Sequence, residues 1–127
     1  MPRPLRVLVV DDNPDQVKSV LLLLETEGYE TRGVYNAHSI LSEVLEFDPD
    51  VVIMDIKMPE RSGWEAASEL RRRVTNLRLL LIAVTGHYTR GVDKVLSEMS
   101  GFDHVLTKPV DPATLLGLIA RHTSQAA

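Results

Sequence analysis

The stretch Leu5-Arg6-Val7-Leu8-Val9-Val10-Asp11-Asp12-Asn13-Pro14 decides the fold. Its first six residues are almost entirely apolar and rich in β-branched side chains, which favours a strand that is covered on both faces in a parallel sheet. Asn13 and Pro14 are typical of a helix start, because asparagine can cap a helix and proline loses no hydrogen bond at the first helical position. The stretch therefore predicts a strand, a short acidic loop and a helix in direct succession.

The same strand-to-helix unit recurs along the whole chain. Strands are predicted at residues 5–10, 29–34, 51–54, 79–84 and 105–107, and the more polar second run indicates an edge strand. The apolar stripes of the intervening helices are Val17, Val20, Leu21 and Leu24; Ile40, Leu41, Val44 and Leu45; Trp64, Ala67 and Leu70; Val92, Val95, Leu96 and Met99; and Leu115, Leu118 and Ile119. This alternation predicts a doubly wound α/β sandwich around a parallel sheet.

Length and composition limit the possible classes of protein. The chain has 127 residues, enough for one domain, which we place at residues 1–122 with a short frayed tail at 123–127. The absence of cysteine excludes disulfides, cysteine-ligated zinc and thiol catalysis. A formal net charge of −4 gives no support for binding to nucleic acid or an anionic membrane. No signal peptide or membrane-spanning run is apparent, so we expect a cytoplasmic protein.

Polar side chains follow four of the five predicted strands. Asp11 and Asp12 end the first strand, Asp55 the third, Thr85 the fourth and Lys108 the fifth, and such positions converge at the carboxyl edge of a parallel sheet. Three carboxylates in one place repel one another unless a cation is bound, and an all-oxygen set of ligands suits Mg²⁺ or Mn²⁺. Asp55 can then attack phosphorus as a nucleophile, while Lys108 and Thr85 bind phosphoryl oxygens. Taken singly, each residue is also consistent with a helix cap, a loop acid or a surface lysine.

These residues lie within motifs that together resemble a known family. The motifs are Leu8-Val9-Val10-Asp11-Asp12-Asn13, Asp55-Ile56-Lys57-Met58-Pro59 followed by Gly63, Val84-Thr85-Gly86, Gly101-Phe102-Asp103 and Leu106-Thr107-Lys108-Pro109. In this order and at this spacing, they make nearly the whole chain similar to the receiver domain of two-component response regulators.

The resemblance implies a flavodoxin-like (βα)5 fold with strand order 2-1-3-4-5. It also implies that a sensor histidine kinase or a histidine phosphotransfer protein phosphorylates Asp55. Asp11 and Asp12 would be the metal-site acids, with Asp12 the more direct ligand, and the backbone carbonyl of Lys57 would complete the site. Thr85 and Lys108 would hold the phosphoryl group, and the bond from Lys108 to the next proline would be cis. Such a domain switches its partners and is not an enzyme for a separate substrate.

The chain departs from the family pattern at two places. Val105 stands where the family usually has an aromatic ring, so a ring flip cannot transmit phosphorylation here. His104 does not replace that ring, because strand alternation points it to the opposite face. Arg61-Ser62 replaces the usual Met-Asp before Gly63, which indicates altered loop packing or, as a second interpretation, a partner contact of Arg61.

Side chains near the predicted site invite further interpretation. Lys57 and His87 are expected to tune the lifetime of the phosphoryl group, although His87 is equally consistent with an exposed loop histidine. His38 and His122 are expected on helix surfaces, and Trp64 in core packing near the loop after Asp55.

Other functional classes fit less well. A degenerate receiver that acts only as an interaction module is supported by Val105 alone. An aspartate phosphatase of the haloacid-dehalogenase type needs an acid two residues after Asp55, where this chain has Lys57. A flavin or nucleotide binder needs glycines or hydroxyls in the first loop, which is acidic instead. The end of the chain, from Lys108 onward, also resembles receivers at the C-terminus of hybrid sensor kinases. The cognate kinase, the output partner and the oligomeric state are not encoded in any motif.

Overall fold

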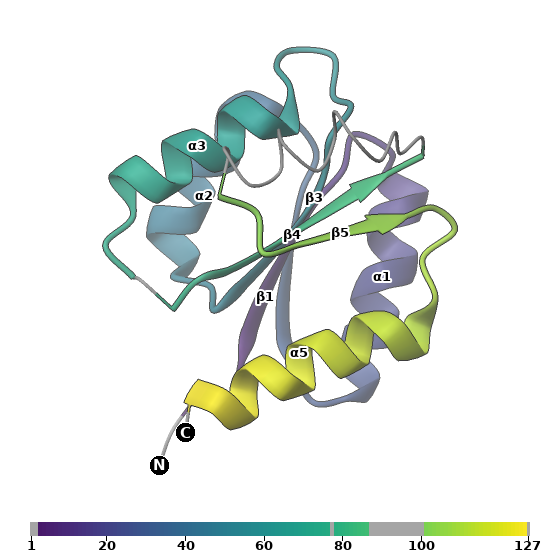
Figure 1. Cartoon of the computed structure of the whole chain (residues 1–127). Coiled ribbons are helices and arrows are strands. Elements are labelled where there is room, and N and C mark those ends of the chain that lie inside the picture. Colours follow the sequence, from purple (N-terminus) through teal and green to yellow (C-terminus); the bar gives the residue numbers. More distant parts are fainter. Residues whose placement is uncertain (1–2, 77, 87–100, 127) are drawn as a thin grey trace.

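The computed structural model describes residues 3–76, 78–86 and 101–126. It contains a five-stranded parallel sheet in the order β2-β1-β3-β4-β5 with helices on both faces (Figure 1), which confirms the predicted flavodoxin-like sandwich. The elements are β1 (Arg6–Val10), α1 (Pro14–Thr26), β2 (Glu30–Val34), the 3-10 helix η1 (Ala37–Ser39), α2 (Ile40–Phe47), β3 (Val51–Asp55), α3 (Gly63–Arg73), β4 (Leu80–Thr85), β5 (His104–Thr107) and α5 (Pro112–Ala126). The helix predicted from Val92 to Met99 lies outside the described residues.

Short polar side chains begin the helices as the sequence indicates. The Asn13 side chain accepts hydrogen bonds from the backbone N–H groups of Asp15 and Gln16, at 3.0 and 3.4 Å. Asp111 caps α5 through the backbone N–H of Thr114, at 3.1 Å. These caps satisfy N–H groups that have no partner within the first helical turn, so they fix where each helix leaves its loop.

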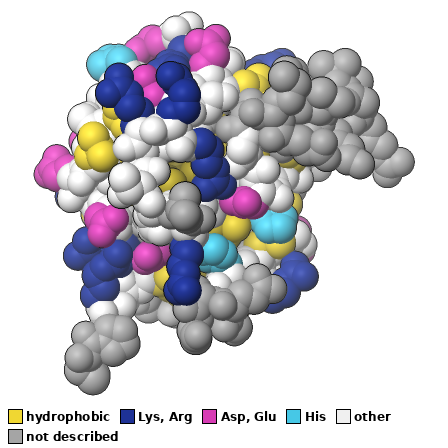
Figure 2. Space-filling view, turned by 60° about the vertical axis from the view of Figure 1, so that its left-hand side comes forward, with side chains coloured by type: hydrophobic (Ala, Val, Ile, Leu, Met, Phe, Trp, Pro, Cys, Tyr) yellow, Lys and Arg dark blue, Asp and Glu magenta, His cyan; other side chains and the backbone are white. Residues whose placement is uncertain are grey.

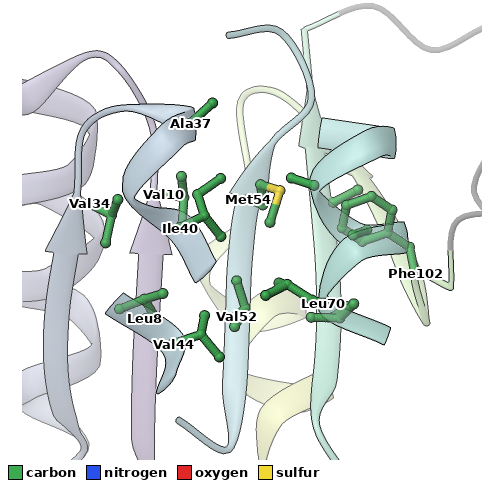
Figure 3. Packing of buried hydrophobic residues seen from close by; sticks show 14 of the residues in the cluster. Leu8, Val10, Val34, Ala37, Ile40, Val44, Val52, Met54, Leu70 and Phe102 are labelled. Atoms are coloured by element: carbon green, nitrogen blue, oxygen red, sulfur yellow. The ribbon is translucent and has the colours of Figure 1, made fainter. Parts of the chain in front are cut away.

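The sheet separates two apolar layers because its side chains alternate between the faces. In β1, Leu8 and Val10 join the layer under α2 and α3, whereas Val7 and Val9 join the layer under α1 and α5. Figure 3 shows the first layer, which extends across the sheet from Val34 to Phe102 and includes Leu8, Val10, Ile40, Val44, Val52, Met54 and Leu70. The two layers hold the sheet rigidly, and the loops at its carboxyl edge are anchored to it.

Two details differ from the prediction. Leu45 is 60% exposed, and Phe47 takes the inward position together with Ile40 and Val44. The eight residues of α2 offered more than one apolar stripe, and the packing selects the stripe that ends at Phe47. In addition, α5 continues to Ala126, so residues 123–126, which were expected to form a frayed tail, belong to this helix.

Among the described residues, no helix is both long and apolar enough to cross a membrane.

Candidate functional site

The predicted acidic residues meet at the carboxyl edge of the sheet. Asp11 follows β1 and Asp55 ends β3, and these strands are paired in register with Val10 beside Met54. One carboxylate oxygen from each of Asp11, Asp12 and Asp55 lies within 4.8 Å of the others. Asp11 and Asp55 are each 7% exposed, whereas Asp12 is exposed. The structure thus brings the three acids together as the motif predicts.

Backbone hydrogen bonds fix the two buried carboxylates. The N–H of Asn13 donates to Oδ1 of Asp11 at 3.0 Å, and the N–H of Lys57 donates to Oδ1 of Asp55 at 3.1 Å. In both cases the donor lies two residues after the acid, so the turn that ends the strand also orients the carboxylate. The backbone N–H of Lys57 therefore lies against the Asp55 carboxylate.

Lys108 reaches the same carboxylates from the neighbouring part of the sheet. Its Nζ lies 3.1 Å from Oδ2 of Asp55 and 3.5 Å from Oδ2 of Asp11. The N–H of Lys108 donates to the carbonyl of Thr85 at 2.9 Å, so Thr85, which is buried, lies at the same edge. The Lys108–Pro109 peptide bond is cis, as the resemblance implied.

The charges of the site are unbalanced. Burial and the nearby Asp55 carboxylate raise the pKa of Asp11, although the Asn13 N–H and Lys108 oppose the rise. Burial alone would lower the pKa of Lys108, but Asp55 and Asp11 more than offset it and raise the pKa above its ordinary value. One ammonium group therefore faces three carboxylates. The excess of negative charge and the all-oxygen donor set fit a hard divalent cation such as Mg²⁺.

Hydrogen bonds and an ion pair within the chain hold the loop between β3 and α3 in place. Ser62 caps α3 by accepting from the N–H of Glu65 at 3.3 Å, and Arg61 is paired with Glu69 at 3.0 Å. The N–H of Gly63 donates to the carbonyl of Ile56 at 2.8 Å. Ser62 and Arg61 therefore hold the start of α3 through contacts within their own chain.

Several supporting contacts were not apparent from the sequence. Arg71 donates to the carbonyls of Gly101 and Leu79, each at 2.8 Å, and pairs with Asp103 at 2.9 Å. Nδ1 of His38 is hydrogen-bonded with Oε2 of Glu60, and this contact joins η1 to the loop after Asp55. Both contacts link residues far apart in the chain, and no local pattern signals them.

The structure describes Trp64, Val105 and His104, three of the positions that the sequence singled out. Trp64 is half-buried and meets Phe102 edge to face, with ring centroids 5.6 Å apart, in agreement with a packing role. Val105 is half-buried against the layer under α2 and α3. His104 lies on the opposite side of β5, as strand alternation predicts, and lines a cleft with Leu118. His87 lies outside the described residues.

The acids open into a cleft of about 570 Å³ between α1 and the start of α5. Asp11, Asp55 and Lys108 form its polar end, and residues such as Val20 and Leu115 form an apolar wall. The fold and the site together define an α/β domain with an acidic pocket, bridged by a lysine, at the carboxyl edge of a parallel sheet.

The comparisons with known proteins agree with this class. The family model of the response regulator receiver domain matches residues 7–120. Protein PilH of Pseudomonas aeruginosa is 34% identical over 114 residues, which cover 90% of this chain and 93% of that protein. An uncharacterised 14.6 kDa protein of Leptolyngbya boryana is 36% identical over 116 residues, which cover 91% of this chain and 88% of that protein.

Solved structures give the same result. A CheY-like receiver domain protein from Methanospirillum hungatei has a TM-score of 0.86 at 29% identity, covering 97% of this chain and 96% of that one. The chemotaxis response regulator CheY4 of Vibrio cholerae has a TM-score of 0.85 at 26% identity, and the match covers 94% of this chain and 99% of that one. This chain belongs to the response regulator receiver domain family.

Proposed function

We propose that this receiver domain accepts a phosphoryl group on Asp55 from a phosphohistidine and thereby changes its interactions with a partner protein. The observation that carries the proposal is the position of Lys108, whose Nζ lies 3.1 Å from Oδ2 of Asp55 while two further acids lie within 4.8 Å. A structural acid needs only one neutralising partner. A lysine and an acidic cluster around one buried carboxylate suit a group that must receive additional negative charge.

The chemistry follows from the residues of the site. An oxygen of Asp55 attacks phosphorus, the phosphorus–nitrogen bond of the phosphohistidine breaks, and its electron pair remains on the imidazole, which takes up a proton. Lys108 attracts the equatorial phosphoryl oxygens, and the Thr85 hydroxyl donates to one of them. The N–H of Lys57 holds the attacking carboxylate in place.

Asp11, Asp12, Asp55 and the backbone carbonyl of Lys57 would hold a divalent ion. When bound, Mg²⁺ or Mn²⁺ would neutralise negative charge among the carboxylates and on the phosphoryl oxygens. The donor in this scheme is a sensor histidine kinase or a histidine phosphotransfer protein, and the domain acts as a switch rather than as an enzyme for a separate substrate.

The test is direct phosphorylation by acetyl phosphate, a small donor that makes the kinase unnecessary. Wild-type protein incubated with acetyl phosphate and Mg²⁺ is expected to gain one phosphoryl group by intact-mass spectrometry, and Asp55→Asn is expected to gain none. Glu27→Gln, which removes an exposed carboxylate elsewhere in the chain, is the matched control and should behave as wild type. Phosphorylation of Asp55→Asn at the wild-type level, or none of the wild type by any donor, would contradict the proposal.

A further inference from the structure

A second polar cleft lies on the part of the molecule where β5 begins and α5 nears its end. Its volume is about 320 Å³. The residues that line it are Leu80, Asp103, His104, Leu118, Arg121 and His122. Figure 2 shows histidine side chains near the middle of one face of the molecule, with Lys or Arg and Asp or Glu side chains around them. None of these residues belongs to the acidic pocket.

The acid in this cleft is already neutralised. Oδ2 of Asp103 accepts from the Arg71 guanidinium at 2.9 Å and from the backbone N–H of Leu81 at 2.8 Å. By contrast, the side chains of Arg121, His104 and His122 have no hydrogen bond or ion pair to any described residue. The side chains that remain available in the cleft are therefore nitrogen groups that carry or can acquire positive charge.

The surroundings make these groups receptive to a negative ligand. His104 and His122 are half-buried, and the floor beneath them is formed by the buried side chains of Leu80 and Leu118. Partial burial weakens the competition from water, so a charge-assisted hydrogen bond is stronger here than on an open surface.

We propose that this cleft binds a small oxyanion, such as phosphate or a carboxylate, between Arg121 and the two histidines. Binding should be stronger when the imidazoles are protonated, because each then adds a positive charge to the cleft. The other charged groups that line the cleft are Arg121 and Asp103, and Asp103 is paired with Arg71. A transition-metal ion is the alternative ligand, but among the described residues Asp103, His104 and His122 do not bring three ligand atoms within 4.8 Å of one another, and the ion would meet the positive charge of Arg121.

The test uses an Asp55→Asn background without divalent ions, so that its result is independent of phosphorylation. Inorganic phosphate and acetate are titrated separately at constant ionic strength into the ¹⁵N-labelled protein, with chloride as the reference anion. At about pH 6, we expect saturable shifts of the amide signals of His104, Leu118 and Arg121, and binding about tenfold weaker for Arg121→Gln, because one charge-assisted hydrogen bond is lost. The comparison of phosphate with acetate shows which class of anion the cleft prefers.

The histidine variants test the pH dependence. His104→Gln and His122→Gln should each reduce the difference in affinity between about pH 6 and about pH 8, whereas His38→Gln, a histidine on another face, should not. Three outcomes would overturn the proposal. They are shifts no larger than those with chloride, an affinity that Arg121→Gln leaves unchanged, and saturable binding of Zn²⁺ that both cleft histidine variants abolish while phosphate and acetate do not bind.

Discussion

At the scale of single residues, Lys108 is the cation that makes the acidic pocket compatible with folding. Its Nζ contacts Asp55 at 3.1 Å and Asp11 at 3.5 Å, and its side chain is 27% exposed. Removing it leaves two buried carboxylates facing each other. The cost is expected to be smaller than for a fully buried ion pair, because solvent reaches part of the lysine.

We predict that Lys108→Gln lowers the free energy of unfolding by about 1 to 2 kcal/mol at neutral pH in the absence of divalent ions. Because the folded protein raises the pKa of Lys108, its stabilising contribution is fully present below the ordinary value of 10.5 and is lost as the pH rises through the raised value. Urea denaturation of both proteins from neutral to alkaline pH measures this difference. The pKa of Tyr29 is raised by burial and by Glu27, but Tyr29 is present in both proteins, so its effect on stability cancels in the difference between them. A difference that vanishes well below 10.5 would contradict the assignment.

At the scale of elements, the space around two glycines differs sharply: Gly63 is closely packed, whereas Gly117 is not. A Cβ added to Gly63 would lie 2.9 Å from the Cα of Ile56 and 3.0 Å from the carbonyl oxygen of Asp55. A Cβ added to Gly117, in the interior of α5, would meet nothing within 4 Å. The start of α3 therefore packs directly on the backbone of Asp55 and Ile56, whereas the middle of α5 has free space on its outer side.

We predict opposite effects for the same substitution at these two glycines. Gly117→Ala should raise the free energy of unfolding by about 0.5 to 1 kcal/mol, because alanine loses less conformational entropy in a helix than glycine does. Gly63→Ala should lower it by about 1 to 3 kcal/mol, because the added methyl group must displace the backbone next to Asp55. Chemical denaturation measures both changes. Two variants that change stability in the same direction would show that the packing around α3 or α5 differs from that in the structure.

Arg71 connects three elements at the opposite edge of the sheet. Its guanidinium, on α3, donates to the carbonyl before β4 and to the carbonyl and carboxylate before β5. A planar fork is required to reach these acceptors together, and lysine does not provide one. The contact fixes the start of β5, the strand that ends beside Lys108.

We predict that Arg71→Lys lowers the free energy of unfolding by about 2 kcal/mol, because most of the charge-assisted hydrogen bonds are lost while the positive charge is kept. Arg72→Lys, at the exposed neighbouring position, should change stability by less than about 0.5 kcal/mol. Thermal and urea unfolding of the two variants provide the comparison. Equal stability of the two proteins would mean that the fork of Arg71 contributes little.

At the scale of the whole molecule, the sequence predicted the features that depend on the spacing of apolar residues and on the order of the strands. Parallel strands with helical crossovers bring the residues after β1, β3, β4 and β5 to one edge, so the meeting of Asp11, Asp55 and Lys108 needed no knowledge of side-chain packing. Periodicity failed at Leu45, because several stripes fit an eight-residue helix and only the packing of Phe47 selects one. The fork of Arg71 depends on residues about thirty positions apart in the chain, and no local pattern carries that information.

Folding and ion binding are linked through Asp11. Since burial and Asp55 raise the pKa of Asp11, its ionised form is less favourable in the folded chain than in the unfolded chain. The stability that Asp11 contributes is therefore present below its ordinary pKa of 3.8 and is lost as the pH rises through the raised pKa. At neutral pH, the ionised Asp11 thus lowers the free energy of unfolding by its full amount. A bound divalent ion, as proposed for this pocket, would reverse that cost and make the charge favourable.

We therefore predict that the stabilities of wild type and Asp11→Asn cross as Mg²⁺ is added. Without divalent ions at about pH 7, Asp11→Asn should be more stable by roughly 1 kcal/mol, because the amide keeps an acceptor for the Asn13 N–H and removes the repulsion from Asp55. Mg²⁺ at about a hundred times its dissociation constant should then stabilise the wild type by about 2.7 kcal/mol and the variant much less. Urea denaturation over a range of Mg²⁺ concentrations, with Na⁺ at matched ionic strength as the control, measures both curves. Parallel curves would show that Asp11 takes no part in holding the ion, and a less stable variant without Mg²⁺ would show that the Asp11 charge is compensated by Lys108 alone.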